Sequence, residues 1–350
     1  MLYNNSMKFI KKILCILLVL TLFGCSKTDS ENNIRSYYAY SIYPVGYLLN
    51  RIGGNRITSI SIQNSSIVQN ATTVENYETI LKNSLYFYHI GSLEPYLDVY
   101  RKEVEQSGAK VVDLSSSSIY AFKRYTPISS NGTINFIESD YYDGDAFNNI
   151  DTYADDLFVW LDPIGMLSMA KELCNHLSSN YAEAASYFQG NFESVENDLI
   201  ALDAAYHNLS TNLQKQNKTI KFVSMTPSFG SWQKAYGIEV YPVCLSKYGA
   251  LPTESQLQII KNRIVQDGVK YIAYEPNMST DMMNLFMSLE TELGLKRVNL
   301  SNISSLTVTQ QTDNKDYLTL MYENLSVLEN IASNAIDEPI ETQETTEVSE

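Results

Sequence analysis

Short apolar runs alternate with segments of helical spacing along most of the chain. In the first half, runs typical of strands lie at residues 35–42, 57–63, 85–89 and 110–114. In the second half, such runs recur at residues 220–225, 239–245, 271–274 and 297–300. Segments with helical spacing separate these runs. This alternation predicts parallel sheets with helices on their faces.

Residues 181–213 predict one unusually long helix. Apolar residues recur there every three or four positions, at Phe188, Phe192, Val195, Leu199, Leu202, Tyr206, Leu209 and Leu213. A helix of about 33 residues would measure ~50 Å, which is longer than one lobe of ordinary size. We therefore expect an α/β fold with two β/α sandwich lobes, each containing a parallel sheet, joined by a long rigid spine helix.

Local signals predict several helix ends. Asp162-Pro163 is typical of a helix start, and Thr253 and Ser279 are placed to act as N-caps. Gly294 is placed to end the helix that Ser279 begins.

These patterns divide the chain into six segments. They are a signal peptide (1–24), a tether (25–34), an N-terminal α/β lobe (35–180), the spine helix (181–216), a C-terminal α/β lobe (217–336) and an acidic tail (337–350). The tail has six acidic residues and no basic or aromatic residue, which is typical of disorder.

The start of the chain has the pattern of a bacterial export signal. Lysines precede the apolar run 13–23, which is shorter than the ~20 residues of an ordinary membrane span. The run ends in Leu-Phe-Gly-Cys, which resembles a lipobox with Cys25 as the lipid attachment site. We expect cleavage before Cys25 and a palmitate-type lipid anchor that holds the protein at the extracytoplasmic face of the cell membrane. The alternative is an uncleaved membrane anchor.

Charge and cysteine content exclude several classes of protein. The formal net charge is −15, from 25 basic and 40 acidic residues, which argues against a nucleic-acid binder. Four cysteines exclude a disulfide-dense scaffold, and three histidines exclude a His-rich metal store. Cys174 and Cys244 could pair or stay as buried free thiols.

Two clusters compete for a metal ion. The loop at residues 115–156 contains oxygen donors suited to calcium or magnesium, at Glu138, Asp140, Asp143, Asp145, Asp151, Asp155 and Asp156. A set of methionines suited to copper(I) comprises Met225, Met278, Met282, Met283 and Met287. The alternatives are a solvated acidic loop and ordinary core packing.

The space between the lobes is the expected binding site. Ligands of open α/β sheets bind beyond the carboxyl ends of the strands, so two facing lobes would form a cleft there. Tyr43, His89 and Glu275 lie at or near strand ends and are possible cleft residues. For Glu275 we favour an anchoring role within its lobe. The catalytic motifs of hydrolases, P-loop proteins and metalloproteases are absent from the sequence, so we do not expect an enzyme.

Several motifs resemble one known family. SIYPVGYLLNRIGG (41–54), SLEPYL (92–97), VWLDP (159–163), GVKYIAYEP (268–276) and DYLTLMYENL (316–325) look like the zinc/manganese solute-binding lipoproteins of ABC importers. The resemblance runs in order from about residue 35 to 335. The resemblance implies two lobes on a rigid helix, with a zinc or manganese ion bound between them. It also implies that the protein delivers this ion to a membrane permease. We expect the protein to be a monomer.

Within this resemblance, the usual metal-ligand positions are substituted. Family members use histidines and carboxylates, and zinc requires three or four such donors. The equivalent positions here are Val68, Phe158, Met225 and Ser301. Valine and phenylalanine cannot coordinate a metal, and a thioether is unsuited to zinc or manganese. We therefore expect metal binding to be lost or altered.

Three functions follow as alternatives. The first is a solute-binding lipoprotein of the importer family with a changed metal site. The second is a surface adhesin or interaction lipoprotein that keeps the fold without transport. The third is a receptor for a small organic ligand, since the substitutions would make the cleft apolar.

Overall fold

The structure is a computed structural model that describes residues 36–117, 120–121, 135–136 and 145–333. The expected signal peptide, Cys25, the tether, the acidic tail and the acidic residues Glu138, Asp140 and Asp143 lie outside the described residues. Among the described residues, no helix is both long and apolar enough to cross a membrane.

The N-terminal lobe is built on a four-stranded parallel sheet. Its strands, in the order β2-β1-β3-β4, are β1 (Ser36–Tyr40), β2 (Ile57–Ser61), β3 (Tyr86–His89) and β4 (Lys110–Asp113). Three helices follow strands in this lobe: α2 (Tyr43–Gly53), α3 (Tyr77–Lys82) and α4 (Pro95–Gln106). Ala39, Ile62 and Phe87 belong to the apolar core between the sheet and α4. The expected βαβ alternation of this lobe is therefore confirmed.

The C-terminal lobe repeats the same architecture. Its parallel sheet has the order β10-β9-β7-β8, with strands β7 (Lys221–Ser224), β8 (Glu239–Pro242), β9 (Tyr271–Tyr274) and β10 (Lys296–Asn299). The helices of this lobe are α7 (Ser231–Tyr236), α8 (Glu254–Gln266), α9 (Thr280–Leu293), α10 (Val308–Thr312) and α11 (Tyr317–Ser333). In both lobes, the loops that follow the carboxyl ends of the strands can therefore contact the other lobe.

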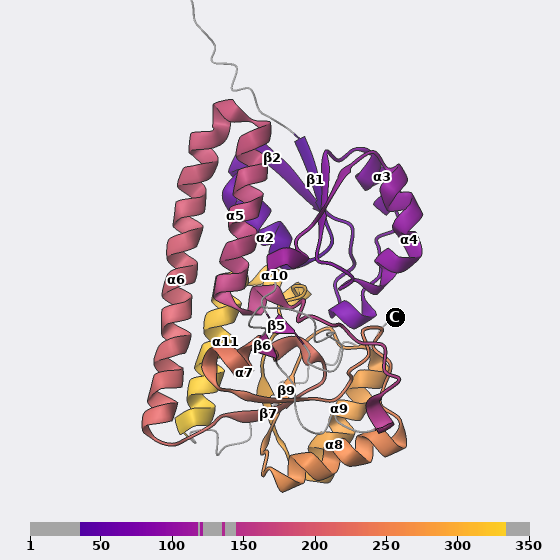
Figure 1. Ribbon diagram of the computed structural model, residues 1–350, viewed down its shortest axis with the longest axis vertical. Coiled ribbons are helices and arrows are strands. Elements are labelled where there is room, and N and C mark those ends of the chain that lie inside the picture. The colour runs from indigo at the N-terminus through magenta and orange to yellow at the C-terminus, as the bar shows by residue number, and fades with distance from the viewer. Residues whose placement is uncertain (1–35, 118–119, 122–134, 137–144, 334–350) are drawn as a thin grey trace, which may run out of the picture. The chain divides into compact units, whose positions relative to one another are not determined.

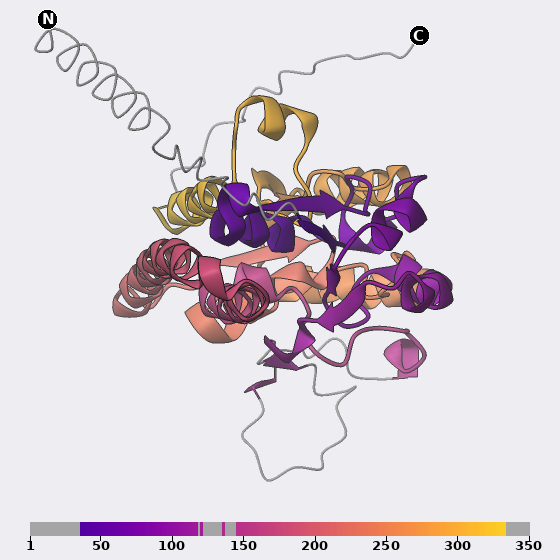
Figure 2. The same cartoon turned by 90° about the horizontal axis from the view of Figure 1, so that it is seen from above.

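Two long helices run beside the sheets. They are α5 (Pro163–Asn180) and α6 (Ala185–Lys215), which pack against each other along their lengths. In Figures 1 and 2 they lie on the side of the N-terminal sheet opposite to α4. Arg51 in α2 pairs with Asp198 in α6 at 2.7 Å, and Tyr206 in α6 donates a hydrogen bond to the Met321 carbonyl oxygen in α11. The 31-residue helix α6 therefore contacts elements of both lobes, as a spine helix does.

Helix ends follow the local chemistry of the sequence. The side chains of Asp162, Thr253 and Ser279 accept hydrogen bonds from the first turns of α5, α8 and α9. Gly294 ends α9 with a φ of +62°, a conformation that glycine adopts without strain. The long helix begins four residues later than expected, at Ala185, because a 3₁₀ turn (Ala182–Ala184) separates it from α5.

The pairing of the cysteines is settled by the fold. Cys174 in α5 and Cys244 after β8 are both buried and both free. Of the five methionines expected as either copper ligands or packing residues, four lie in or beside the C-terminal core, and Met287 is 44% exposed. Met225 and Met282 belong to that core, and Met278 and Met283 pack against it.

Candidate functional site: the junction of the two lobes

The four positions that the resemblance predicts to be equivalent to the family's metal ligands all lie after strands or beside short turns, near the junction of the lobes. Val68 begins a 3₁₀ turn after β2, Phe158 precedes the turn Val159–Leu161, Met225 follows β7, and Ser301 lies two residues after β10. Their exposed fractions are 0%, 1%, 0% and 8%. None of the four presents its side chain to an open, solvated cleft.

Apolar packing surrounds Met225 and Phe158 and also holds Ile67, the neighbour of Val68. Ile67, beside Val68, belongs to the same apolar cluster as Met225 and Met282 of the C-terminal lobe. The ring of Phe158 packs on Trp160, with the centroids 5.2 Å apart. The N-terminal loop thus inserts an apolar side chain into the core of the other lobe.

Hydrogen bonds fasten the same loop to the C-terminal lobe. The hydroxyls of Ser304 and Ser305 donate to the Ser66 carbonyl oxygen at 3.2 and 2.9 Å. The backbone N–H of Ile67 donates to the Asn277 carbonyl oxygen at 3.3 Å. The loop before Val68 is therefore held by polar as well as apolar contacts.

Tyr43 lies at this junction. Its backbone N–H donates to the Ser304 carbonyl oxygen at 3.3 Å, and its ring packs on Tyr47. Burial raises the pKa of its hydroxyl above the ordinary range. The side chain is therefore a neutral donor or acceptor near the junction.

Glu275 is fully buried, and its carboxylate accepts an unusually complete set of hydrogen bonds. Oε1 accepts from the backbone N–H groups of Met225 and Thr226 at 2.7 and 3.0 Å. Oε2 accepts from the Thr226 hydroxyl at 2.6 Å, from Asn302 Nδ2 at 2.9 Å and, more weakly, from Ser228 at 3.4 Å. Burial raises the pKa of this carboxyl, while these donors oppose the shift.

The network around Glu275 joins the carboxyl ends of β7, β9 and β10. Trp160 extends it towards the N-terminal half of the chain, since its indole N–H donates to the Asn302 carbonyl oxygen at 2.7 Å. Tyr317 in α11 donates in turn to the Trp160 carbonyl oxygen at 2.6 Å. Glu275 is thus the centre of a structural network and has little acceptor capacity left for a ligand.

Ser301 and its neighbours form a strained turn after β10. Ile303 has a φ of +56°, which is unfavourable for a β-branched residue. The Ser301 hydroxyl accepts a hydrogen bond from the Ile303 N–H, and Asn302 Oδ1 accepts one from the Ser304 N–H, both at 3.1 Å. The turn directs the amide of Asn302 to Glu275 and leaves Ser301 as a turn-forming residue.

A second buried carboxyl, Asp156, lies beside Phe158. Its two oxygens accept hydrogen bonds from the backbone N–H groups of Phe158 and Ser231 at 3.1 and 3.0 Å. Burial raises the pKa of Asp156 to about 7. Asp156 therefore joins the segment before Trp160 to the start of α7.

His89 lies at the end of β3, apart from the Glu275 network. Its Nδ1 is 3.0 Å from the Gly91 carbonyl oxygen, and burial lowers the pKa of the imidazole. Nearby Glu94 is fully buried and hydrogen-bonded to the Ser41 hydroxyl, and burial raises its pKa to about 7. The polar contact of His89 is thus with the backbone, as is typical of a structural histidine.

The donor set at the junction does not fit a transition metal. Among the described residues, no group of three or more histidine, cysteine, aspartate or glutamate side chains could hold a metal ion. Asp145 and Asp151, from the acidic loop, have other partners: Asp145 accepts from Asn148, and Asp151 pairs with Lys247 at 3.4 Å. Valine, phenylalanine and a buried thioether do not provide the donors that zinc requires.

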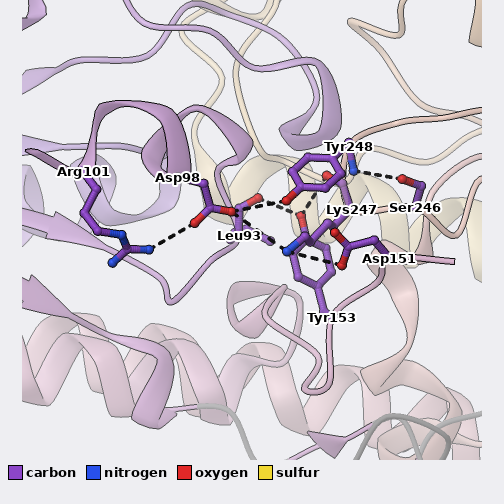
Figure 3. Close-up of polar contacts among 8 residues, drawn as sticks. All are labelled: Leu93, Asp98, Arg101, Asp151, Tyr153, Ser246, Lys247 and Tyr248. Carbon is purple, nitrogen blue, oxygen red and sulfur yellow. Dashed lines mark hydrogen bonds and ion pairs between the residues drawn. The ribbon is translucent and has the colours of Figure 1, made fainter. Parts of the chain in front are cut away.

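A polar cluster also connects the lobes (Figure 3). Tyr153 is buried, and its hydroxyl lies 2.7 Å from the Leu93 carbonyl oxygen and 3.3 Å from that of Lys247. Lys247 Nζ lies 4.0 Å from the carboxylate of Asp98 in α4, to which the hydroxyl of Tyr248 also donates. This cluster joins α4 of one lobe to the loop after β8 of the other.

A pocket of about 240 Å³ lies next to this cluster. It is at the carboxyl end of β8, between the segment 147–151 and the loop before α8. Its walls mix apolar side chains, such as Phe147 and Leu245, with the polar side chains of Asn149 and Gln256. This mixture suits a small, partly apolar molecule.

Sequence reasoning missed several residues of the junction. The hydrogen bonds at the junction are made by Thr226, Asn302 and Ser304, whereas the sequence singled out only their neighbours Met225 and Ser301, as positions equivalent to family metal ligands. Asp156 was assigned to an acidic loop although it is buried. Its position two residues before Phe158 in an apolar context is the only sequence signal for that burial.

Comparison with known proteins identifies the family. Residues 39–331 match the ZnuA family, described as "zinc-uptake complex component A periplasmic". The zinc-binding protein AdcA of Streptococcus pyogenes is 28% identical over 176 residues, or 50% of this chain and 33% of that protein. The zinc-binding lipoprotein AdcA of Streptococcus pneumoniae is 27% identical over 174 residues, or 49% of this chain. The match spans 33% of the length of either relative.

Solved structures share the fold. Zinc-bound AdcA of Streptococcus pneumoniae gives a TM-score of 0.63 at 17% identity, covering 85% of this chain and 58% of that one. The laminin-binding protein of Streptococcus agalactiae and the zinc-binding protein TroA of Treponema pallidum each give 0.64, at 16% and 14% identity, covering 85% of this chain and 99% of theirs. The family match covers most of the chain and the two-lobed fold agrees with it. This chain therefore belongs to the ZnuA family, the solute-binding proteins of zinc and manganese ABC importers.

Proposed function

We propose that this chain is an extracytoplasmic solute-binding protein whose interlobe site does not bind a transition metal in the manner of its family. The observation that carries the proposal is the burial of Val68, Phe158 and Met225 without a nitrogen or carboxylate donor among them. The saturated hydrogen bonding of Glu275 supports it, because a metal would have to displace several donors from that carboxylate.

We further propose that Cys25 anchors the protein to the membrane and that the protein delivers its cargo to an ABC permease as a monomer, without catalysis. The lipobox-like sequence before Cys25 supports the anchor, as does the description of the pneumococcal relative as a lipoprotein. The importer family supports the permease. A Cys25→Ala variant is expected to lose membrane retention, whereas unchanged retention and mass would contradict lipidation.

A small organic molecule is the second candidate for the cargo. The pocket at the end of β8 favours it, because ligands of open α/β sheets bind at this edge of the sheet. An adhesin role rests only on the laminin-binding relative, described as "a bifunctional protein with adhesin and metal transporting activity". A thermal-shift screen of organic solutes tests the second candidate, and no response across a broad panel would count against it.

Zinc titration of the metal-stripped protein tests the leading proposal. We expect no stoichiometric zinc binding at sub-micromolar concentration by calorimetry and no bound zinc by elemental analysis. Phe158→His alone is expected to restore nothing, since one imidazole supplies one of the three or four donors needed. His89→Ala serves as a control and is expected to leave the titration unchanged. Tight one-to-one zinc binding by the unmodified chain would refute the proposal.

A further inference from the structure

A second pocket, of about 500 Å³, lies at the amino ends of the C-terminal strands. Its walls are formed by the first residues of β7, β9 and β10, by the residues just before β7 and β9, and by the last turns of α6 and α11. In Figure 1 the lower ends of α6 and α11 lie beside the beginning of β7. Because the strands are parallel, this pocket is at the opposite edge of the sheet from the lobe junction.

The pocket is lined by four lysines: Lys218, Lys221, Lys270 and Lys296. Its one acidic lining residue, Asp267, accepts hydrogen bonds from Arg263 and Tyr241 at 2.6 and 2.7 Å. Arg263, which does not line the pocket, therefore supplies a positive partner for that carboxylate. Such a gathering of positive charge is unexpected in a chain with a net charge of −15.

Two of the four ammonium groups are not neutralised within the described part of the chain. Lys221 pairs with Glu239 at 3.1 Å. Lys218 donates to the Ala332 carbonyl oxygen at 3.2 Å, but neither it nor Lys270 forms an ion pair with a described carboxylate. Positive charges that line one pocket repel each other, and a bound anion removes that repulsion.

We propose that this lysine pocket binds a small phosphate-bearing anion. Lysine binds phosphate as a point charge without requiring a planar partner, so several lysines can share one phosphate group. The hydroxyl of Thr219, which also lines the pocket, adds a neutral donor. The volume falls within the range of small-molecule sites. The inference is independent of the proposed function, since it concerns the opposite edge of the sheet.

Calorimetric titration of the full-length protein with inorganic pyrophosphate at low salt tests the proposal. We expect saturable binding that weakens with added salt. Lys218→Ala/Lys270→Ala should weaken it roughly tenfold or more, which corresponds to the loss of about 1.4 kcal/mol. The control is Lys82→Ala/Lys102→Ala, which removes the same charge from exposed residues of the N-terminal lobe and should change affinity less than about twofold.

Three results would overturn the proposal: no saturable binding of either inorganic pyrophosphate or glycerol phosphate, equal losses in the two double variants, or binding that appears only in a chain ending at Ser333. The last result would mean that the acidic residues after 336 occupy the pocket in place of a free anion. Glycerol phosphate, the soluble form of a lipid headgroup, is titrated in parallel. Lysine-dependent binding of either compound supports the site. Tighter binding of pyrophosphate would indicate a free anion as the natural ligand, and tighter binding of glycerol phosphate would indicate a lipid headgroup.

Discussion

At the scale of single residues, the junction of the lobes is organised by buried carboxylates. A carboxylate taken out of water is stabilised only if its oxygens receive enough hydrogen bonds. Glu275 receives them from the loops after β7 and β10, and Asp156 receives them from two backbone N–H groups. These residues therefore determine how the loops at the junction are held, and their replacement tests that role directly.

Glu275→Gln is expected to destabilise the protein by about 3 kcal/mol. The amide NH₂ would face groups that now donate to a carboxylate oxygen, and a broken buried network leaves donors without acceptors. Urea unfolding followed by circular dichroism measures the change in the free energy of unfolding. Glu193→Gln, on the exposed face of α6, is the control and should change it by less than about 0.5 kcal/mol. Equal effects of the two variants would contradict the network role.

The pKa of Asp156 predicts a pH-dependent stability. Its folded-state pKa of about 7 lies above the ordinary value of 3.8, so the folded protein holds a proton that the unfolded chain releases in that range. This contribution to stability is complete below about pH 4 and is lost as the pH rises through 7. The loss is up to about 4 kcal/mol, since each pKa unit corresponds to about 1.4 kcal/mol.

The measurement is the free energy of unfolding of the wild type and of Asp156→Asn between pH 4 and pH 8. The variant has no proton to lose at this position, so its stability should fall less over this range. Parallel curves for the two proteins would show that Asp156 does not carry the dependence. The comparison cancels the contributions of other titrating groups that both proteins share.

At the scale of elements, capping boxes decide where two helices begin. Thr253 caps α8 and Thr307 caps α10, each with a glutamine three residues later that bonds back to the cap. The two helices differ in what they bury. Ile260 and Ile264 of α8 lie in the C-terminal core, whereas α10 has no buried residue.

The two caps should therefore differ in their effect on global stability. Thr253→Ala is expected to cost about 1 kcal/mol, because α8 cannot fray without exposing part of the core. Thr307→Ala is expected to cost less than about 0.5 kcal/mol, since α10 can unfold locally. Urea unfolding measures both values. A cost for Thr307→Ala as large as that for Thr253→Ala would contradict this difference in coupling.

At the scale of the whole molecule, contacts between the lobes come from the loops at their strand ends. The Tyr153 cluster joins α4 to the loop after β8, and the serine contacts to Ser66 join the other side. Together with α6, these contacts hold the lobes against each other with Val68, Phe158 and Met225 buried. A protein that releases a cargo from between its lobes must break such contacts.

Tyr153→Phe is expected to lower the free energy of unfolding by about 1–2 kcal/mol. The change leaves the buried Leu93 carbonyl oxygen without its donor. Tyr248→Phe is the matched control, because Tyr248 is 47% exposed and its hydroxyl makes a long bond of 3.4 Å to Asp98. It should cost less than about 0.5 kcal/mol. A larger loss of unfolding free energy in Tyr248→Phe than in Tyr153→Phe would show that the lobes are connected mainly through Asp98 and not through Tyr153.

The fold was predictable from local patterns. Strands such as Tyr271–Tyr274 and caps such as Thr253 and Ser279 depend on side chains close in sequence, so their residue types predicted them. The short helix α10 was missed, since a five-residue helix without a buried face has no periodic apolar signal. The assignment of Val68, Phe158, Met225 and Ser301 to the family's ligand positions comes only from resemblance to a family and stays a prediction.

By itself, the sequence determined the two α/β lobes, the long helix between them and the scarcity of metal donors, because these depend on residue type and spacing. Only the tertiary structure decided that Glu275 is surrounded by donors, that Asp156 is buried, and that four lysines line one pocket. Burial and hydrogen bonding of a side chain depend on residues far away in the chain, such as Asn302 for Glu275, and no local pattern contains that information.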